Sequence, residues 1–179
     1  MLGKISAVRA ISARDEPEWL VDRDDVEAVP DEVVVATLPF RQPMLADMIK
    51  IQRAACMRPS ELCNLKVGDL DTSNPLVWTV GMKKHKTARY GAKRMLAFGV
   101  CEIEILKRRI EGKSPDDYVF SPKEAAIERW EIARANRKTK VQPSQVERNK
   151  KREKHRLDRY KDYWEPASYR RAVKYARDK

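Results

Sequence analysis

An arginine directly before a helix-initiating proline is the first residue of this sequence whose position suggests chemistry. The segment 56–71 reads CMRPSELCNLKVGDLD, in which Arg58 precedes Pro59 and Glu61 follows two residues later. Proline is tolerated at the first helical position, so a helix is predicted to begin here. The dipole at a helix N-terminus disfavours positive charge, and Arg58 therefore needs an anion close to it.

Two anions fit that requirement, and the sequence leaves both open. In the first interpretation, Glu61 lies at the third helical position, where its carboxylate caps the helix and pairs with Arg58. In the second, the guanidinium of Arg58 and the free amides of the helix start bind a phosphate, to which a guanidinium donates two parallel hydrogen bonds.

Hydrophobic spacing and turn residues place this segment among helices and one small sheet. The fold class expected is α+β and mainly α, with a small antiparallel hairpin or three-stranded sheet. The strands are joined by GMKKHKTARYGAK, which gives the hairpin a basic tip. The predicted elements are one or two short helices within 22–38, a helix from Met44, a helix from Arg58 and Pro59, strands at 76–80 and 94–98, and helices at 102–111, 122–138 and 167–177.

The charge of the chain favours a polyanionic partner. The 179 residues include 38 Lys and Arg against 27 Asp and Glu, a formal net charge of +11. The first 35 residues carry four basic and nine acidic side chains, whereas residues 121–179 carry 19 basic and nine acidic ones. An excess of this size points to nucleic acid or an acidic membrane surface rather than to a small neutral substrate.

The densest basic run lies between residues 134 and 159, where apolar residues are almost absent within 139–159. We interpret 139–159 as a basic arm that is either solvated or ordered by its ligand. As a ligand-ordered arm it would follow a DNA backbone and carry little sequence information. Membrane binding is disfavoured because the arm has no apolar face to insert. The predicted DNA contacts in and before this arm are Arg137, Lys138, Lys140, Arg148, Lys150, Lys151 and Arg152.

No cofactor or metal is expected, and the protein is predicted to be cytoplasmic and nucleoid-associated. Three cysteines without a C-x-x-C pair indicate neither a disulfide framework nor a zinc site. No apolar run approaches the roughly 20 residues that span a bilayer. The start MLGKISAVRAISARDE turns polar before a secretion-type apolar core develops.

The order of residues around Arg58 resembles that of the tyrosine recombinases, or phage-type integrases. Their catalytic domain carries the motif R-x-x-E-L-x-x-L-x-x-x-D-[IL]-D, matched here by Arg58, Glu61, Leu62, Leu65, Asp69, Leu70 and Asp71. The family also places a lysine on the following hairpin, and Lys86 in His85-Lys86-Thr87 is the corresponding residue. Lys83, Lys84 and Lys93 compete for that role, and the alternative is a hairpin tip that only rests on DNA through Lys83, Lys84, His85, Arg89 and Lys93. The resemblance covers about residue 22 to the end, and phrases such as DDYVFSP are similar to a bacterial subgroup found in planctomycete genomes.

The resemblance implies site-specific recombination of double-stranded DNA without metal. A tyrosine attacks a phosphodiester to give a 3′-phosphotyrosyl link and a free 5′-hydroxyl. Fixed positive charge stabilises the negative charge that gathers on the phosphate. By this likeness Arg58 faces the nonbridging oxygens, Lys86 protonates the leaving oxygen, and Glu61 and Asp69 support the site.

The sequence departs from the family in the second half of the motif set. The family pattern continues with H-x-x-R and a nucleophilic tyrosine, but His85 is followed at the third position by Ala88 and His155 by Asp158. The late tyrosines are interpreted as packing or DNA-facing aromatics: Tyr160, Tyr163, Tyr169 and Tyr175. We therefore expect a truncated catalytic core that binds DNA without cleaving it.

This expectation divides the chain into three parts, with two rival functions. Residues 1–21 are a disordered or linker start, 22–120 the N-terminal half of a recombinase catalytic domain, and 121–179 a basic helical extension with its charged arm. The core is expected to leave apolar helix faces uncovered, and to form a homo-oligomer on DNA or join a complementing C-terminal half. The alternative function is a non-enzymatic DNA-binding protein that keeps the recombinase fold as a scaffold, and an RNA-associated basic protein is a weaker one.

Overall fold

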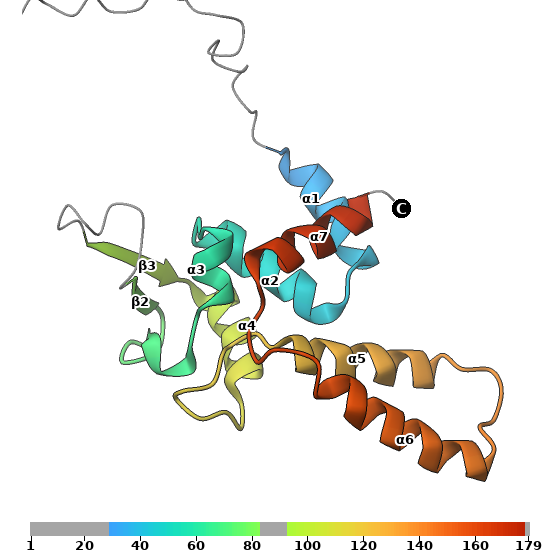
Figure 1. Ribbon diagram of the computed structural model, residues 1–179. Helices are drawn as coiled ribbons and strands as arrows, with labels where there is room; N and C mark the ends of the chain where they lie inside the picture. Colours follow the sequence, from blue (N-terminus) through green and yellow to red (C-terminus); the bar gives the residue numbers. More distant parts are fainter. Residues whose placement is uncertain (1–28, 83–92, 178–179) are drawn as a thin grey trace, which may run out of the picture.

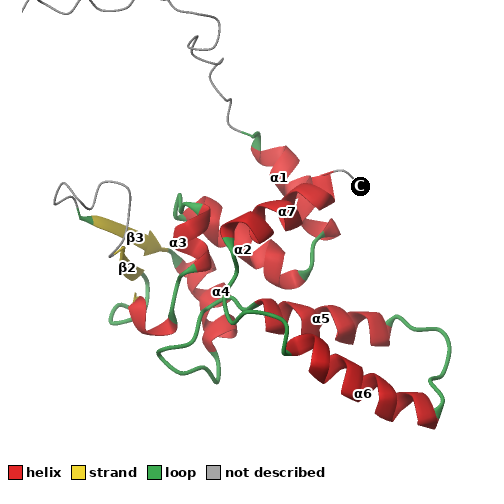
Figure 2. Ribbon diagram, in the orientation of Figure 1, coloured by secondary structure: helices red, strands yellow, loops and turns green. Residues whose placement is uncertain are grey.

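The computed structural model describes residues 29–82 and 93–177, and the structural statements below concern these residues. They form a mainly helical fold with seven α-helices, two 3₁₀ turns and three short strands, which confirms the predicted fold class (Figures 1 and 2). The elements in chain order are α1 (Asp31–Thr37), η1 (Leu38–Phe40), α2 (Pro43–Ala54), α3 (Pro59–Cys63), η2 (Val67–Asp69), β1 (Leu70–Asp71), β2 (Trp78–Met82), β3 (Arg94–Phe98), α4 (Val100–Ile110), α5 (Pro122–Ala135), α6 (Pro143–Leu157) and α7 (Pro166–Arg177).

The three strands form an antiparallel sheet in the order β1-β2-β3. Val80 of β2 lies between Leu70 of β1 and Leu96 of β3, and side chains alternate between the buried and exposed faces. The predicted strand 94–98 is confirmed, but β2 begins two residues later than predicted. The amide of Leu76 donates to Oδ1 of Asn74 at 2.9 Å, so this turn continues past the predicted strand start.

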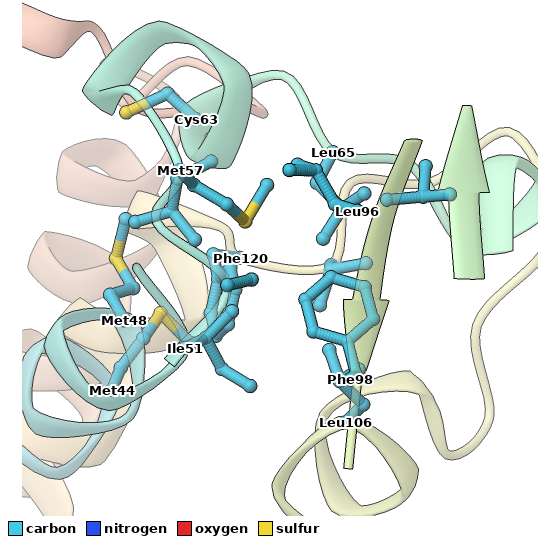
Figure 3. Close-up of a cluster of buried hydrophobic side chains, with 14 of the residues drawn as sticks. Met44, Met48, Ile51, Met57, Cys63, Leu65, Leu96, Phe98, Leu106 and Phe120 are labelled. Carbon is cyan, nitrogen blue, oxygen red and sulfur yellow. The ribbon is translucent and has the colours of Figure 1, made fainter. Parts of the chain in front are cut away.

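The hydrophobic core lies between the inner face of the sheet and the surrounding helices (Figure 3). The expectation of uncovered apolar helix faces is wrong for α2, α3 and α4. Met44 and Met48 of α2 and Leu106 of α4 are fully buried. Helix α5 packs on α2, α7 packs on α3, and α4 packs on α2 and β3. The C-terminal helices therefore supply the cover that a shorter core would lack.

A network of ion pairs among Asp47, Arg109 and Glu128 joins α2, α4 and α5. Arg109 of α4 donates from Nε to Oδ2 of Asp47 in α2 at 2.8 Å, and it also pairs with Glu128 of α5. Both Asp47 and Arg109 have less than a tenth of their surface exposed. Glu128 accepts a further hydrogen bond from the amide of Met44 at 3.2 Å, which ties the first turn of α2 to α5.

The charged segment 139–159 contains a helix that the sequence analysis did not predict. α6 runs over Pro143–Leu157 and forms a helical hairpin with α5, which extends away from the sheet in Figure 1. The segment has too few apolar residues to show helical periodicity. Lys, Arg, Glu and Gln nevertheless have high helix propensity, and Pro143 occupies the favourable first position.

Candidate functional site

Glu61 caps the helix that Arg58 precedes. The backbone N–H of Arg58 donates to Oε2 of Glu61 at 2.9 Å, and its Nη1 donates to Oε1 at 2.8 Å. The pairing predicted between these residues is confirmed. The side chain of Glu61 is only 3% exposed, whereas that of Arg58 is 46% exposed. The buried carboxylate thus anchors a guanidinium that still reaches solvent, so pairing with Glu61 does not preclude binding a phosphate.

A second arginine, which the sequence analysis missed, reaches the same carboxylate. Nε of Arg94, at the start of β3, lies 3.1 Å from Oε1 of Glu61, and its Nη2 donates to the carbonyl of Cys56 at 2.9 Å. Arg94 shares its face of β3 with the buried Leu96 and Phe98. An arginine on the inward face of a strand needs a buried partner, and that alternation was the available clue.

Glu61 is ionised over a wide pH range. Burial raises the pKa of this carboxyl group, but the hydrogen bonds from Arg58 and the charge of Arg94 outweigh burial, and its pKa lies below the usual value. The ionised carboxylate joins the start of α3 to the base of β3. It therefore fixes one arginine from each element.

The turn between α2 and α3 requires an unusual backbone conformation at Cys56. Its φ is 49°, in the left-handed region that residues with a Cβ seldom adopt. This turn directs the Cys56 carbonyl towards Arg94 and brings the following Met57 into the core. The turn at Cys56 before Arg58 and the cap by Glu61 after it therefore both fix the backbone at Arg58.

A groove of about 600 Å³ runs beside α3. It contains two of the three carboxylates of the motif, Glu61 and Asp69, and lies next to the end of β2, where the hairpin begins. Lys66 lies over the ring of Tyr118 at 5.4 Å from its centroid on the groove wall. The described residues that line the groove are Ser60, Glu61, Asn64, Leu65, Lys66, Asp69, Gly81, Met82 and Tyr118.

The other predicted site residues fall into three groups. Lys83, Lys84, His85, Lys86 and Arg89 lie outside the described residues, and their roles stay predictions. Lys93 is exposed immediately before β3. The exposed residues of the basic run lie in the α5–α6 connection or on α6, as follows: Arg137, Lys138, Lys140, Arg148, Lys150, Lys151 and Arg152.

Two of the late tyrosines have packing roles, as interpreted from the sequence. Tyr169 of α7 is 2% exposed and donates its hydroxyl proton to Oε1 of Gln52 at 2.7 Å. Burial raises the pKa of Tyr169, which disfavours the phenolate that a nucleophile requires. The ring of Tyr163 packs against that of Tyr118 in a tilted arrangement, with a centroid separation of 5.4 Å. Tyr160 and Tyr175 are exposed.

Comparison with protein-family models gives a match to the phage integrase family over residues 21–176. The chain belongs to the phage integrase family. Comparisons with curated proteins and with solved structures gave no significant match. Family membership implies that this integrase-family chain binds DNA and takes part in site-specific recombination. Within its described part, no helix combines the length and apolar character needed to cross a bilayer.

Proposed function

We propose that this chain is the DNA-binding front part of a tyrosine recombinase catalytic core and contributes Arg58 and Lys86 to one scissile phosphate. In this proposal, residues 22–120 carry both groups and residues 121–179 form a basic helical extension. Glu61 and Asp69 support the site, and Lys83, Lys84, His85, Arg89 and Lys93 contact the DNA backbone. The protein acts in the cytoplasm at the nucleoid, within a bacterial subgroup similar to planctomycete integrases.

The shared carboxylate of Glu61 is the observation that carries this proposal. Glu61 holds Arg58 at the start of α3 and Arg94 at the base of β3. In the sequence, Lys86 falls between β2 and β3, which pair as a hairpin, and precedes Arg94 by eight residues. The hairpin therefore starts and ends beside the helix that presents Arg58, which favours convergence of Arg58 and Lys86 on one phosphate.

The different roles proposed for Arg58 and Lys86 follow from the chemistry of their side chains. In the reaction of the family, the oxygen of a nucleophilic tyrosine attacks phosphorus, the bond to the 5′ oxygen breaks, and the leaving 5′ oxygen takes up a proton. A guanidinium suits the nonbridging oxygens because it is planar and permanently charged, whereas an ammonium group can give up its proton. Arg58 thus stabilises the pentavalent phosphate, and Lys86 protonates the leaving group.

The chain by itself is proposed to bind DNA without cleaving it. Neither histidine begins an H-x-x-R box, so none of the late tyrosines follows one as the nucleophile of the family does, and Tyr169 is in addition buried. Without a nucleophile, no covalent intermediate forms, whatever Arg58 and Lys86 stabilise.

A trapping experiment with nicked suicide duplexes of randomised sequence tests this proposal. The purified chain is expected to retain the duplexes in a filter-binding assay and to form no denaturant-resistant protein–DNA adduct. A covalent adduct would show that the chain is active alone. Full DNA binding by both Arg58→Ala and Lys86→Ala variants would instead favour a non-enzymatic DNA-binding protein on a recombinase scaffold.

A further inference from the structure

α6 has two faces of opposite character. The side that meets α5 includes the half-buried Asn149, Glu153 and Leu157. The opposite side, called here the outer face of α6, consists of the exposed residues Arg148, Lys151, Arg152, His155 and Arg159. Their spacing of three, four, seven and eleven residues from Arg148 places them on one side of a helix, with Arg159 just beyond its last turn.

The outer face borders a shallow groove whose lining is entirely basic. The groove measures about 380 Å³. Its lining residues within the described chain are Arg148, Lys151, Arg152, His155, Arg156 and Arg159. None of these arginines and lysines forms an ion pair with another described residue. The nearby Glu153 is directed away from the outer face, since it pairs with Arg134 of α5 at 2.9 Å.

The α5–α6 hairpin presents this face on a defined scaffold. The Arg134–Glu153 pair joins α5 to α6, and Nζ of Lys123 donates to Asp162 at 2.5 Å at the base of the hairpin. The hairpin projects from the rest of the described chain on the side away from β2 and β3 (Figure 1). The outer face is therefore a separate surface from the groove beside α3.

We propose that the outer face of α6 binds the phosphate backbone of duplex DNA, as a second contact apart from the Arg58 site. Duplex DNA as the ligand rests on the proposed function. From Arg148 to Arg159 the face extends about 16 Å, and duplex DNA presents roughly nine phosphate charges over that length. The face has no apolar side chain to insert into a membrane and no aromatic residue to stack on a base.

The outer face includes only some of the basic residues between 134 and 159. Lys150 lines the groove between α5 and α6, so it is not part of the outer face. His155 and Arg159, which the sequence analysis did not select, belong to it. Arg137, Lys138 and Lys140 in the α5–α6 connection stay predicted contacts at the tip of the hairpin.

A matched pair of charge variants tests the proposal. Arg148→Gln/Arg152→Gln removes two charges from the outer face, and Lys50→Gln/Lys174→Gln removes two exposed charges from α2 and α7. Binding of a fluorescent duplex of about 30 base pairs is measured by anisotropy against salt concentration, and circular dichroism checks that helix content is unchanged. The outer-face variant should lose about tenfold or more in affinity at 0.1 M salt, and its salt slope should decrease by roughly 1.8. The control variant should lose less than about threefold, because its charges act only at long range.

The outcomes separate this inference from the proposed function. Equal losses for the two variants, with tight binding by the parent chain, would overturn the outer-face contact alone. A parent chain that binds no duplex DNA would overturn the proposed function as well. If structured RNA displaced the duplex at lower concentration than unlabelled DNA did, the assignment of DNA as the ligand would be wrong.

Discussion

At the scale of single residues, a buried carboxylate organises the candidate site. Glu61 accepts two hydrogen bonds from Arg58 and pairs with Arg94, yet it has almost no surface of its own in contact with solvent. A charge in such a place is stable only when its partners remain, and removing it leaves two arginines poorly compensated. Function and stability are therefore expected to depend on this one group.

Replacing Glu61 by Gln should lower the free energy of unfolding at pH 7 by about 2 kcal/mol. The native pKa of Glu61 is lowered from 4.5, so its stabilising contribution is complete above that pH and declines as pH falls towards the native pKa. The difference between the parent chain and E61Q should therefore shrink below about pH 4.5. Urea denaturation at pH 7 and at pH 3 to 4 measures it, with the exposed Glu104→Gln as control. An E61Q deficit that stays constant down to pH 3 would contradict this role.

The left-handed backbone at Cys56 gives a second residue-scale prediction. Glycine adopts this φ without steric strain but has more conformational entropy to lose, so Cys56→Gly should change the free energy of unfolding by less than about 1 kcal/mol. The β-branched variant Cys56→Val should lose about 1–2 kcal/mol, because its side chain disfavours positive φ. Thermal denaturation of both variants measures the difference. Equal stability of the two variants would argue against a left-handed conformation at this position.

At the scale of elements, the fold depends on how α2, α4 and α5 are joined. Asp47, Arg109 and Glu128 each come from a different helix of this set. The hydrogen bonds of Arg109 and the charges of its two carboxylate partners outweigh burial, which alone lowers the pKa of arginine, and the pKa of Arg109 is raised. Arg109 therefore stays charged, and its ion pairs link the core to the base of the α5–α6 hairpin.

Arg109→Met should cost about 3 kcal/mol, since it leaves the buried Asp47 without its closest partner. The combined variant Asp47→Leu/Arg109→Met should recover part of this loss, because it removes the buried charge of Asp47, while the half-buried Glu128 keeps its hydrogen bond from the amide of Met44. Chemical denaturation of the single and double variants provides the comparison. A double variant less stable than Arg109→Met alone would show that the network stabilises the helices by more than mutual neutralisation.

At the scale of the whole molecule, two basic regions lie on different parts of the folded structure. One is the neighbourhood of Arg58 and Arg94 at the sheet, and the other is the outer face of α6 on the projecting hairpin (Figure 1). Helices α5 and α7 connect them by packing on α2 and α3, so the basic C-terminal part also completes the core. Helices α5 and α7 thus provide the packing on the core, and α6 carries the exposed basic face.

The sequence predicted much of this arrangement, and its failures have physical causes. The α2 and α4 helices and strand β3 were predicted because apolar spacing and turn residues agree there. α6 was missed because its packing face is mostly polar, with Asn149 and Glu153 in place of apolar residues. The Arg58–Glu61 pair was predicted from local spacing, whereas the contact of Arg94 with Glu61 joins residues 33 positions apart and depends on the register of the sheet.

The central claim is that Arg58 and Lys86 act on a single phosphate, and a double-mutant cycle on DNA affinity tests it most directly. Duplex binding is measured for the parent chain, Arg58→Ala, Lys86→Ala and the double variant, with Arg58→Ala/Arg152→Gln as a distant control pair. Two groups that contact the same phosphate should show a coupling free energy of about 1 kcal/mol or more, while the control pair should be additive within about 0.5 kcal/mol. Strict additivity of Arg58→Ala and Lys86→Ala, or unchanged affinity in Arg58→Ala, would contradict the claim.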